Sequence, residues 1–153
     1  MTIQDYRKLL EDQEYLTQTI IPLYQQEENK LKYSKMKLLH LFFENGIQQN
    51  YNIQYLETLC SLLDNTCAQI FSYSLYNYLD PAGHESIARL LHFALPTDLE
   101  LLSVNLRFHE LIFSALEEYE VCANITYLHV KVLAEIDRKL AQEPQTPKNS
   151  KLL

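Results

Sequence analysis

Five histidines and three cysteines are the side chains of this 153-residue chain best suited to metal binding or nucleophilic chemistry. Helical metal centres use Glu-x-x-His or His-Glu-x-x-His spacing, because it places several ligands on one helix face. Neither spacing occurs in the chain. Asn105 and His109 share a face at i, i+4, but asparagine is a poor metal ligand. The sequence therefore predicts no metal site and no cofactor.

Nucleophilic catalysis has equally little support from residue types and spacing. A reactive cysteine needs an electropositive, partly exposed setting, whereas Cys60, Cys67 and Cys122 stand among Leu, Ile and Val. No serine lies in a Gly-x-Ser-x-Gly turn. Adjacent acids such as Glu117 and Glu118 point in different directions on a helix, so they form no acid/base pair. We expect buried free thiols, no catalytic residues and no enzymatic activity.

The elements that carry these residues are predicted to be helices throughout. Only two glycines occur, Gly46 and Gly83, and leucine-rich segments at three- and four-residue steps fill most of the chain. This pattern predicts an all-α, single-domain bundle of four to six helices over residues 1–142. The polar, proline-containing residues 143–153 are predicted to form a disordered tail.

Capping residues and breakers mark the expected helix ends in the first half of the chain. The first helix begins at Thr2 and ends or kinks near Pro22, because proline lacks an amide donor. A second helix runs from Pro22 to Glu44, and Gly46 closes it. Asn52 is the expected cap of a long amphipathic helix that follows.

Similar signals occur in the second half. Asp80 and Pro81 read as an N-cap and a first helical residue, and Thr97 with Glu100 matches a capping box. The last helical pattern, 121–140, is either separate from the preceding helix or continuous with it, since neither glycine nor proline divides them.

The charge of the chain limits which classes of partner it can bind. The formal net charge is −7, and residues 54–120 carry ten acidic against two basic residues. This balance argues against general nucleic-acid binding, since phosphates require clustered Lys and Arg. The acidic stretch is either a solvated surface or a docking surface for a basic protein.

The chain lacks a signal-peptide pattern and any apolar run of the roughly 20 residues that spans a bilayer, which predicts a cytoplasmic protein without membrane contact.

The chain is also rich in tyrosine. The chain has eleven tyrosines, which suit interfaces because they combine contact area with a polar tip, although packing in the core is the alternative. We predict that a protein partner with a basic surface contacts Glu57, Asp64, Tyr73, Tyr76, Asn77, Asp80, His84 and Glu85. A homo-oligomer is a further expectation for such a bundle.

Three segments resemble the Rsd/AlgQ regulators of sigma factor. They are SLYNYLDPAGHESIARLL (74–91), KMKLLHLFFENGI (35–47) and LETLCSLLD (56–64). The chain can be aligned to the same family segment in two mutually exclusive ways. One alignment places the acidic residue of the family at Asn77, and the other places it at Asp64. The resemblance implies an all-helical protein that binds the housekeeping sigma factor and sequesters it from core RNA polymerase.

Another segment, DLELLSVNLRFHELIFSAL (98–116), is similar to the ligand-binding domain of FadR-type GntR regulators around its Asp-x-x-Phe-His metal motif. Asn105 stands in the place of the aspartate. This second resemblance implies small-ligand or metal sensing around His109. The sequence thus leaves three functions open: binding of a protein partner, sensing of a small ligand or metal, and a structural homo-oligomer.

Overall fold

The computed structural model describes residues 3–71 and 81–142, and every regular element within these two ranges is helical. This confirms the all-α prediction. The helices are α1 (Ile3–Glu11), α2 (Gln13–Tyr15), the π-helical turn η1 (Leu16–Ile20), α3 (Ile21–Gln26), α4 (Lys30–Gln48), α5 (Ile53–Ile70), α6 (Pro81–Phe93), α7 (Pro96–Ala115) and α8 (Tyr119–Gln142). With α2, η1 and α3 taken as one continuous helix, these ranges hold seven helices, more than the predicted four to six. None of them has both the length and the apolarity to cross a membrane.

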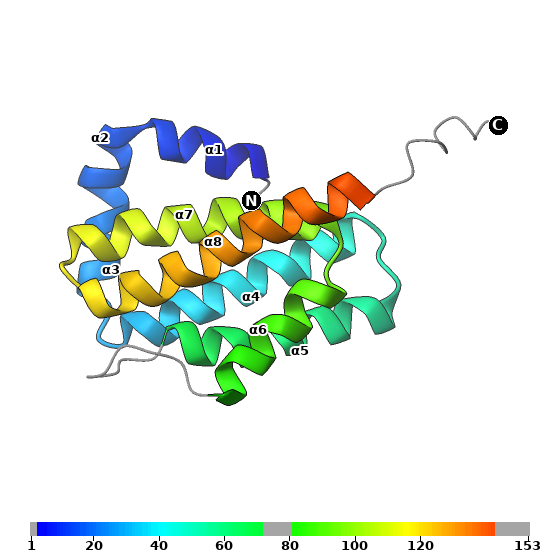
Figure 1. Cartoon of the computed structure of the whole chain (residues 1–153). Helices are drawn as coiled ribbons and strands as arrows, with labels where there is room; N and C mark the ends of the chain where they lie inside the picture. The colour runs from blue at the N-terminus through cyan, green and yellow to red at the C-terminus, as the bar shows by residue number, and fades with distance from the viewer. Residues whose placement is uncertain (1–2, 72–80, 143–153) are drawn as a thin grey trace.

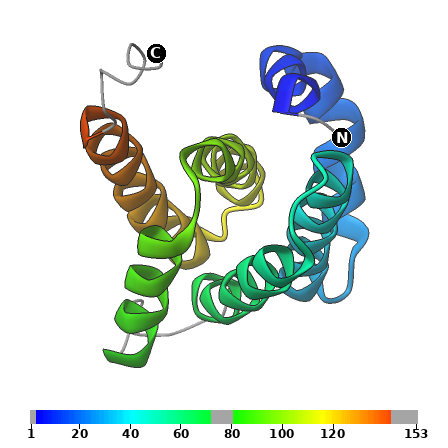
Figure 2. The ribbon, with the colours of Figure 1, turned by 90° about the vertical axis from the view of Figure 1, so that its right-hand side faces the viewer.

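Helix α7 occupies the centre of the arrangement. Figure 1 shows α1 lying along α7 on one side and α8 along it on the other, with α4, α5 and α6 beneath. Seen from the end in Figure 2, α7 lies between the α8 and α6 side and the α1, α4 and α5 side. Its sequence explains this place, because its buried residues cover a broad half of the helix: Leu99, Leu101, Leu102, Leu106, Phe108, Ile112 and Phe113. They belong to one connected core with residues of the other long helices.

The extra helix comes from the N-terminal segment. Pro22 was expected to end or kink the first helix and to begin a second one that runs to Glu44. Instead, a helix that starts at Gln13 continues through Pro22 to Gln26, and the next helix begins only at Lys30. The π-helical turn that precedes Pro22 shifts the hydrogen-bond register where proline lacks its N–H. The chain breaks instead at Asp12, whose Oδ1 accepts a hydrogen bond from the Tyr15 N–H at 3.0 Å. Asp12 thereby caps a new helix.

The role predicted for Gly46 is wrong. Helix α4 runs on to Gln48, and Asn50 takes the left-handed conformation (φ 59°) that closes it. The N–H of Tyr51 then donates to the carbonyl of Gly46 at 2.9 Å, which completes a Schellman motif. Gly46 itself is buried against α5, where an added Cβ would lie only 2.3 Å from Cδ1 of Leu56. Its lack of a side chain lets α4 and α5 approach closely.

The remaining boundaries divide between confirmed and corrected predictions. As predicted, Asn52 caps α5, and its side-chain oxygen accepts a 2.9 Å hydrogen bond from the Gln54 N–H. Helix α6 begins at Pro81, also as predicted. The expected N-cap of α6, Asp80, lies outside the described residues. The Thr97 capping box does not form, because α7 already begins at Pro96. Glu117, with φ 60°, ends α7, so the last two helices are separate. The predicted tail, 143–153, also lies outside the described residues.

Candidate functional site

An open groove of about 640 Å³ runs between α4 and α5. Its walls are apolar side chains from both helices together with a few polar ones: Met36, Leu39, His40, Phe43, Cys60, Ser61 and Asp64. Met36 and Phe43 remain 56% and 50% exposed, and Ile47, one turn further along α4, is 55% exposed. This row of exposed apolar side chains is therefore the candidate binding surface.

The sequence of α4 produces this row because apolar residues occur on two of its faces. Leu38, Leu41 and Phe42 point into the core, whereas Met36 and Phe43, seven residues apart, point outward. Seven residues make about two helical turns, so the two outward side chains lie on one face.

One acidic side chain of α5 lines the groove, and a second lies on the same face of that helix. Asp64 lies in its wall, and its Oδ1 is 2.9 Å from Nζ of Lys35 on α4. Glu57 lies about two turns earlier on α5 and is exposed. On α4, Nε2 of His40 is 3.2 Å from Oε1 of Glu44. Two of the predicted partner-binding residues, Glu57 and Asp64, thus lie along the exposed face of one helix.

Two other predicted residues lie on α6. Nδ1 of His84 is 3.1 Å from the hydroxyl oxygen of Tyr127, so His84 faces α8 and not the groove. Glu85 pairs with Arg89 one turn along its own helix. The last four predicted contact residues fall outside the described ranges: Tyr73, Tyr76, Asn77 and Asp80.

One acid of the predicted acidic stretch is withdrawn from the surface. Asp98 is 1% exposed and accepts hydrogen bonds of 2.7 Å from the hydroxyl groups of Tyr51 and Tyr55. Burial, together with the hydrogen bond to Asp98, raises the pKa of Tyr51 to about 12. Asp98 therefore joins α5 to α7 and offers no charge to a partner.

A second polar cluster crosses the contact between α7 and α8. Oγ of Ser103 lies 3.1 Å from Nε2 of His129, and Nδ1 of that ring lies 3.0 Å from Oε1 of Glu110. Because a carboxylate only accepts hydrogen bonds, the Nδ1–H donates to Glu110, and in the neutral ring Nε2 then accepts from the serine. Oε2 of Glu110 accepts a further 2.9 Å bond from the Thr126 hydroxyl. Sequence reasoning missed this cluster, although Ser103 and Glu110 share a helix face.

The order serine, histidine, carboxylate is that of a nucleophilic triad, but the place of Ser103 in its helix does not suit such a site. Acyl transfer needs N–H donors directed at the developing oxyanion. Ser103 lies in the middle of α7, where backbone N–H groups bond to carbonyls one turn back. We therefore interpret Ser103, His129 and Glu110 as a hydrogen-bonded link between two helices.

The pair Asn105 and His109 lies at the centre of the bundle, where both residues are fully buried. The His109 ring donates from Nδ1 to the Asn105 carbonyl at 3.0 Å and packs against Phe71 and Phe113. Burial lowers the pKa of His109 to about 4, so the ring is neutral at pH 7. Among the described residues, none forms a hydrogen bond to Nε2 of His109 or to Oδ1 of Asn105. Within the two described ranges, no three His, Cys, Asp or Glu side chains gather in a way that could hold a metal ion.

The three cysteines are free thiols. Cys67 is buried as expected, whereas Cys60 and Cys122 are partly exposed. Burial raises the pKa of all three, most strongly in Cys67, to about 12. A raised pKa leaves little thiolate at neutral pH.

Comparison of the chain with protein-family models, curated proteins and solved structures found no match to any of them.

Proposed function

We propose that this protein is a non-enzymatic regulator, a single-domain bundle that binds an amphipathic basic helix of another protein in the groove between α4 and α5. The observation that carries the proposal is the half-exposed pair Met36 and Phe43 above a largely apolar groove that has Asp64 in its wall. Glu57 adds a second acid two turns earlier on the same face of α5. An amphipathic helix lays its apolar face into such a groove, with anchors spaced by three, four or seven residues.

Apolar burial and charge contribute differently to binding. Covering a large apolar side chain such as Phe43 contributes on the order of 1.5–3 kcal/mol. Charges at the edge speed encounter and select basic partners more than they hold the complex. Lys35 already offsets part of the charge of Asp64, so Glu57 is the acid more available to a partner.

The housekeeping sigma factor is the partner that we propose. The segments 35–47 and 56–64, which resemble the Rsd/AlgQ regulators, lie in α4 and α5 and supply the two walls of the groove. Occupation of a sigma-factor helix by this groove would block its access to core RNA polymerase. The protein would act in the cytoplasm without contacting nucleic acid itself.

Direct titration of the purified full chain into the housekeeping sigma factor of its host, followed by calorimetry, tests the proposal. Phe43→Ala and the double variant Glu57→Lys/Asp64→Lys should each weaken binding about tenfold or more, which corresponds to about 1.4 kcal/mol. Glu14→Lys, an exposed charge reversal on α2, is the matched control and should bind normally. Circular dichroism checks that each variant is folded. No binding by the wild type removes the sigma factor, and unchanged affinity in the variants removes the groove.

A second candidate function, recognition of a small ligand in the core, has one observation in its favour. Oδ1 of Asn105 and Nε2 of His109 are buried acceptors to which no described residue donates, and such groups normally have a donor. A small ligand with N–H or O–H groups, or a metal ion, would satisfy them. Thermal unfolding with ammonium, Zn²⁺ or Mn²⁺ tests this, because a ligand of the native state raises the midpoint. A shift that persists in His109→Phe would place the ligand elsewhere.

A further inference from the structure

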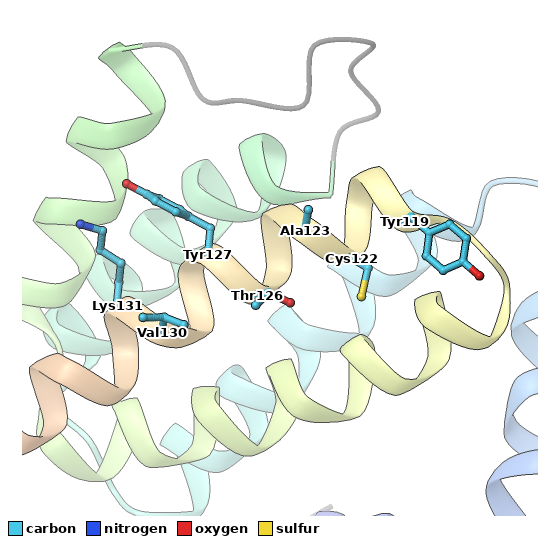
Figure 3. Close-up of a pocket in the computed structure, with 7 residues that line it drawn as sticks. All are labelled: Tyr119, Cys122, Ala123, Thr126, Tyr127, Val130 and Lys131. Atoms are coloured by element: carbon cyan, nitrogen blue, oxygen red, sulfur yellow. The ribbon is translucent and has the colours of Figure 1, made fainter.

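Helix α8 has a second apolar face, opposite the one it buries against the core. Val121, Ile125 and Val132 point inward and are fully buried. On the outward side, Tyr119 and Val130 are 63% and 60% exposed. Figure 3 shows these two side chains with the others that line an open groove along α8: Cys122, Ala123, Thr126, Tyr127 and Lys131. The groove has a volume of about 500 Å³.

Large and small side chains alternate along this face in a self-complementary way. Tyr119 and Val130 are large, whereas Ala123 and Ala134 are small, and all four are exposed. If two copies of α8 pack antiparallel about a two-fold axis near Thr126, Val130 of each copy meets Ala123 of the other. In the same register, Tyr119 meets Ala134. Large side chains then fill the spaces that small ones leave, as packing at an isologous interface requires.

The charges beside this face agree with the same register. Glu120 and Lys131 are eleven residues apart, about three helical turns, and therefore lie on the same flank of α8. Along the helix, the midpoint between Glu120 and Lys131 lies within one residue of the midpoint between Ala123 and Val130. In the antiparallel pair, Lys131 of each copy consequently lies beside Glu120 of the other, which forms two opposite-charge pairs. In the single chain, Nζ of Lys131 lies 5.3 Å from the centre of the Tyr127 ring.

We propose that this outward face of α8, defined by Tyr119, Ala123, Val130 and Ala134, binds the same face of a second copy of the chain. The face carries both signs of charge in positions that match under a two-fold axis, which favours a second copy over a uniformly basic or acidic partner. Tyr127 supports the face from one side, where its hydroxyl meets His84 of α6. The groove between α4 and α5 is formed by other helices, so the dimer and the regulator are independent proposals.

Sedimentation velocity of the full chain at several concentrations, from about 1 to 200 µM, tests the interface. The wild type should shift from monomer to dimer within this range. Val130→Glu places two carboxylates in the contact and should raise the dissociation constant at least tenfold. Lys32→Glu, an exposed reversal on α4, is the control and should dimerise normally. A wild type that remains monomeric throughout overturns the proposal.

Charge exchange tests the antiparallel register itself. Lys131→Glu alone and Glu120→Lys alone should each weaken the dimer, because each places like charges beside each other twice. The double variant Lys131→Glu/Glu120→Lys restores opposite charges and should recover the wild-type dissociation constant. Recovery would not occur if these residues acted only through the stability of the monomer or faced a different partner. Additive losses in the double variant contradict the register.

Discussion

The hydroxyl group of Tyr55 donates to Oδ2 of Asp98 over 2.7 Å and accepts a hydrogen bond from the Leu95 N–H at 3.0 Å. One side chain of α5 thus holds both the start of α7 and the buried acid in its first turn. The ring also stacks on Phe93 with 4.9 Å between centroids. This relationship joins the two halves of the chain at the end of the bundle.

Removal of the Tyr55 hydroxyl should cost more stability than removal of the neighbouring one. Tyr55→Phe leaves two hydrogen bonds unmade, whereas Tyr51→Phe leaves one. We expect about 2–3 kcal/mol for Tyr55→Phe and about 1–2 kcal/mol for Tyr51→Phe. Both variants lose a bond to the buried carboxylate, and only Tyr55→Phe also leaves the Leu95 N–H without its acceptor. Urea unfolding at pH 7 measures both. Equal losses would show that the bond to Leu95 contributes nothing.

The same cluster should make the protein sensitive to high pH. Burial raises the pKa of Tyr51 to about 12, above its unfolded value near 10. The folded state therefore binds more protons than the unfolded state in this range, so stability is complete below pH 10 and falls as pH rises toward 12. Urea midpoints measured between pH 9 and 11.5 follow the loss. Tyr51→Phe should make the fall shallower than in the wild type, and an unaltered slope would contradict the assignment.

His109 should produce the opposite dependence at low pH. Its pKa is lowered by burial to about 4, so the neutral ring stabilises the fold above pH 6.5 and this contribution is lost as pH falls toward 4. At pH 5 the loss should be about 2 kcal/mol relative to pH 7. His109→Phe keeps an aromatic ring beside Phe71 and Phe113 and should remove most of this change. A variant with the same pH dependence as the wild type would place its origin elsewhere.

Gly46 should not tolerate even one methyl group while Leu56 is present. Alanine favours a helix over glycine by about 1 kcal/mol, but the new Cβ would lie 2.3 Å from Leu56 Cδ1. Overpacking of this kind costs typically 1–3 kcal/mol, so we expect Gly46→Ala to destabilise the protein. In a Leu56→Ala background the space is free, and Gly46→Ala should become stabilising. The sign change, measured by urea unfolding, is the test.

Glu110 should matter for the contact between α7 and α8 and not for any reaction of Ser103. Glu110→Ala removes the acceptor of His129 and Thr126 and should lower stability by about 1–3 kcal/mol. A fluorophosphonate probe, which labels activated serines, should leave Ser103 unmodified in the wild type. Labelling that disappears in Ser103→Ala and His129→Ala would establish a nucleophilic site and overturn our interpretation.

Local signals in the sequence were sufficient for the helices and for several of their ends. The spacing of Leu and Ile determines which face of a helix avoids water. Asn52 accepts hydrogen bonds from amides of the first turn, and Pro81 suits a first helical position, where the missing N–H has no helical acceptor. These effects involve neighbours within a few residues, so they can be read without knowledge of the fold. The same applies to Glu57 and Asp64, whose shared face on α5 follows from their spacing alone.

Tertiary structure alone decided the features that depend on a distant neighbour. Gly46 reads as a helix terminator until Leu56 packs against it, and Asp98 reads as a surface acid until Tyr51 and Tyr55 enclose it. Ser103 and Glu110 acquire a partner only when α8 brings His129 between them. In each case the deciding distance joins residues separated by ten or more positions, and chain folding, not local propensity, sets that distance.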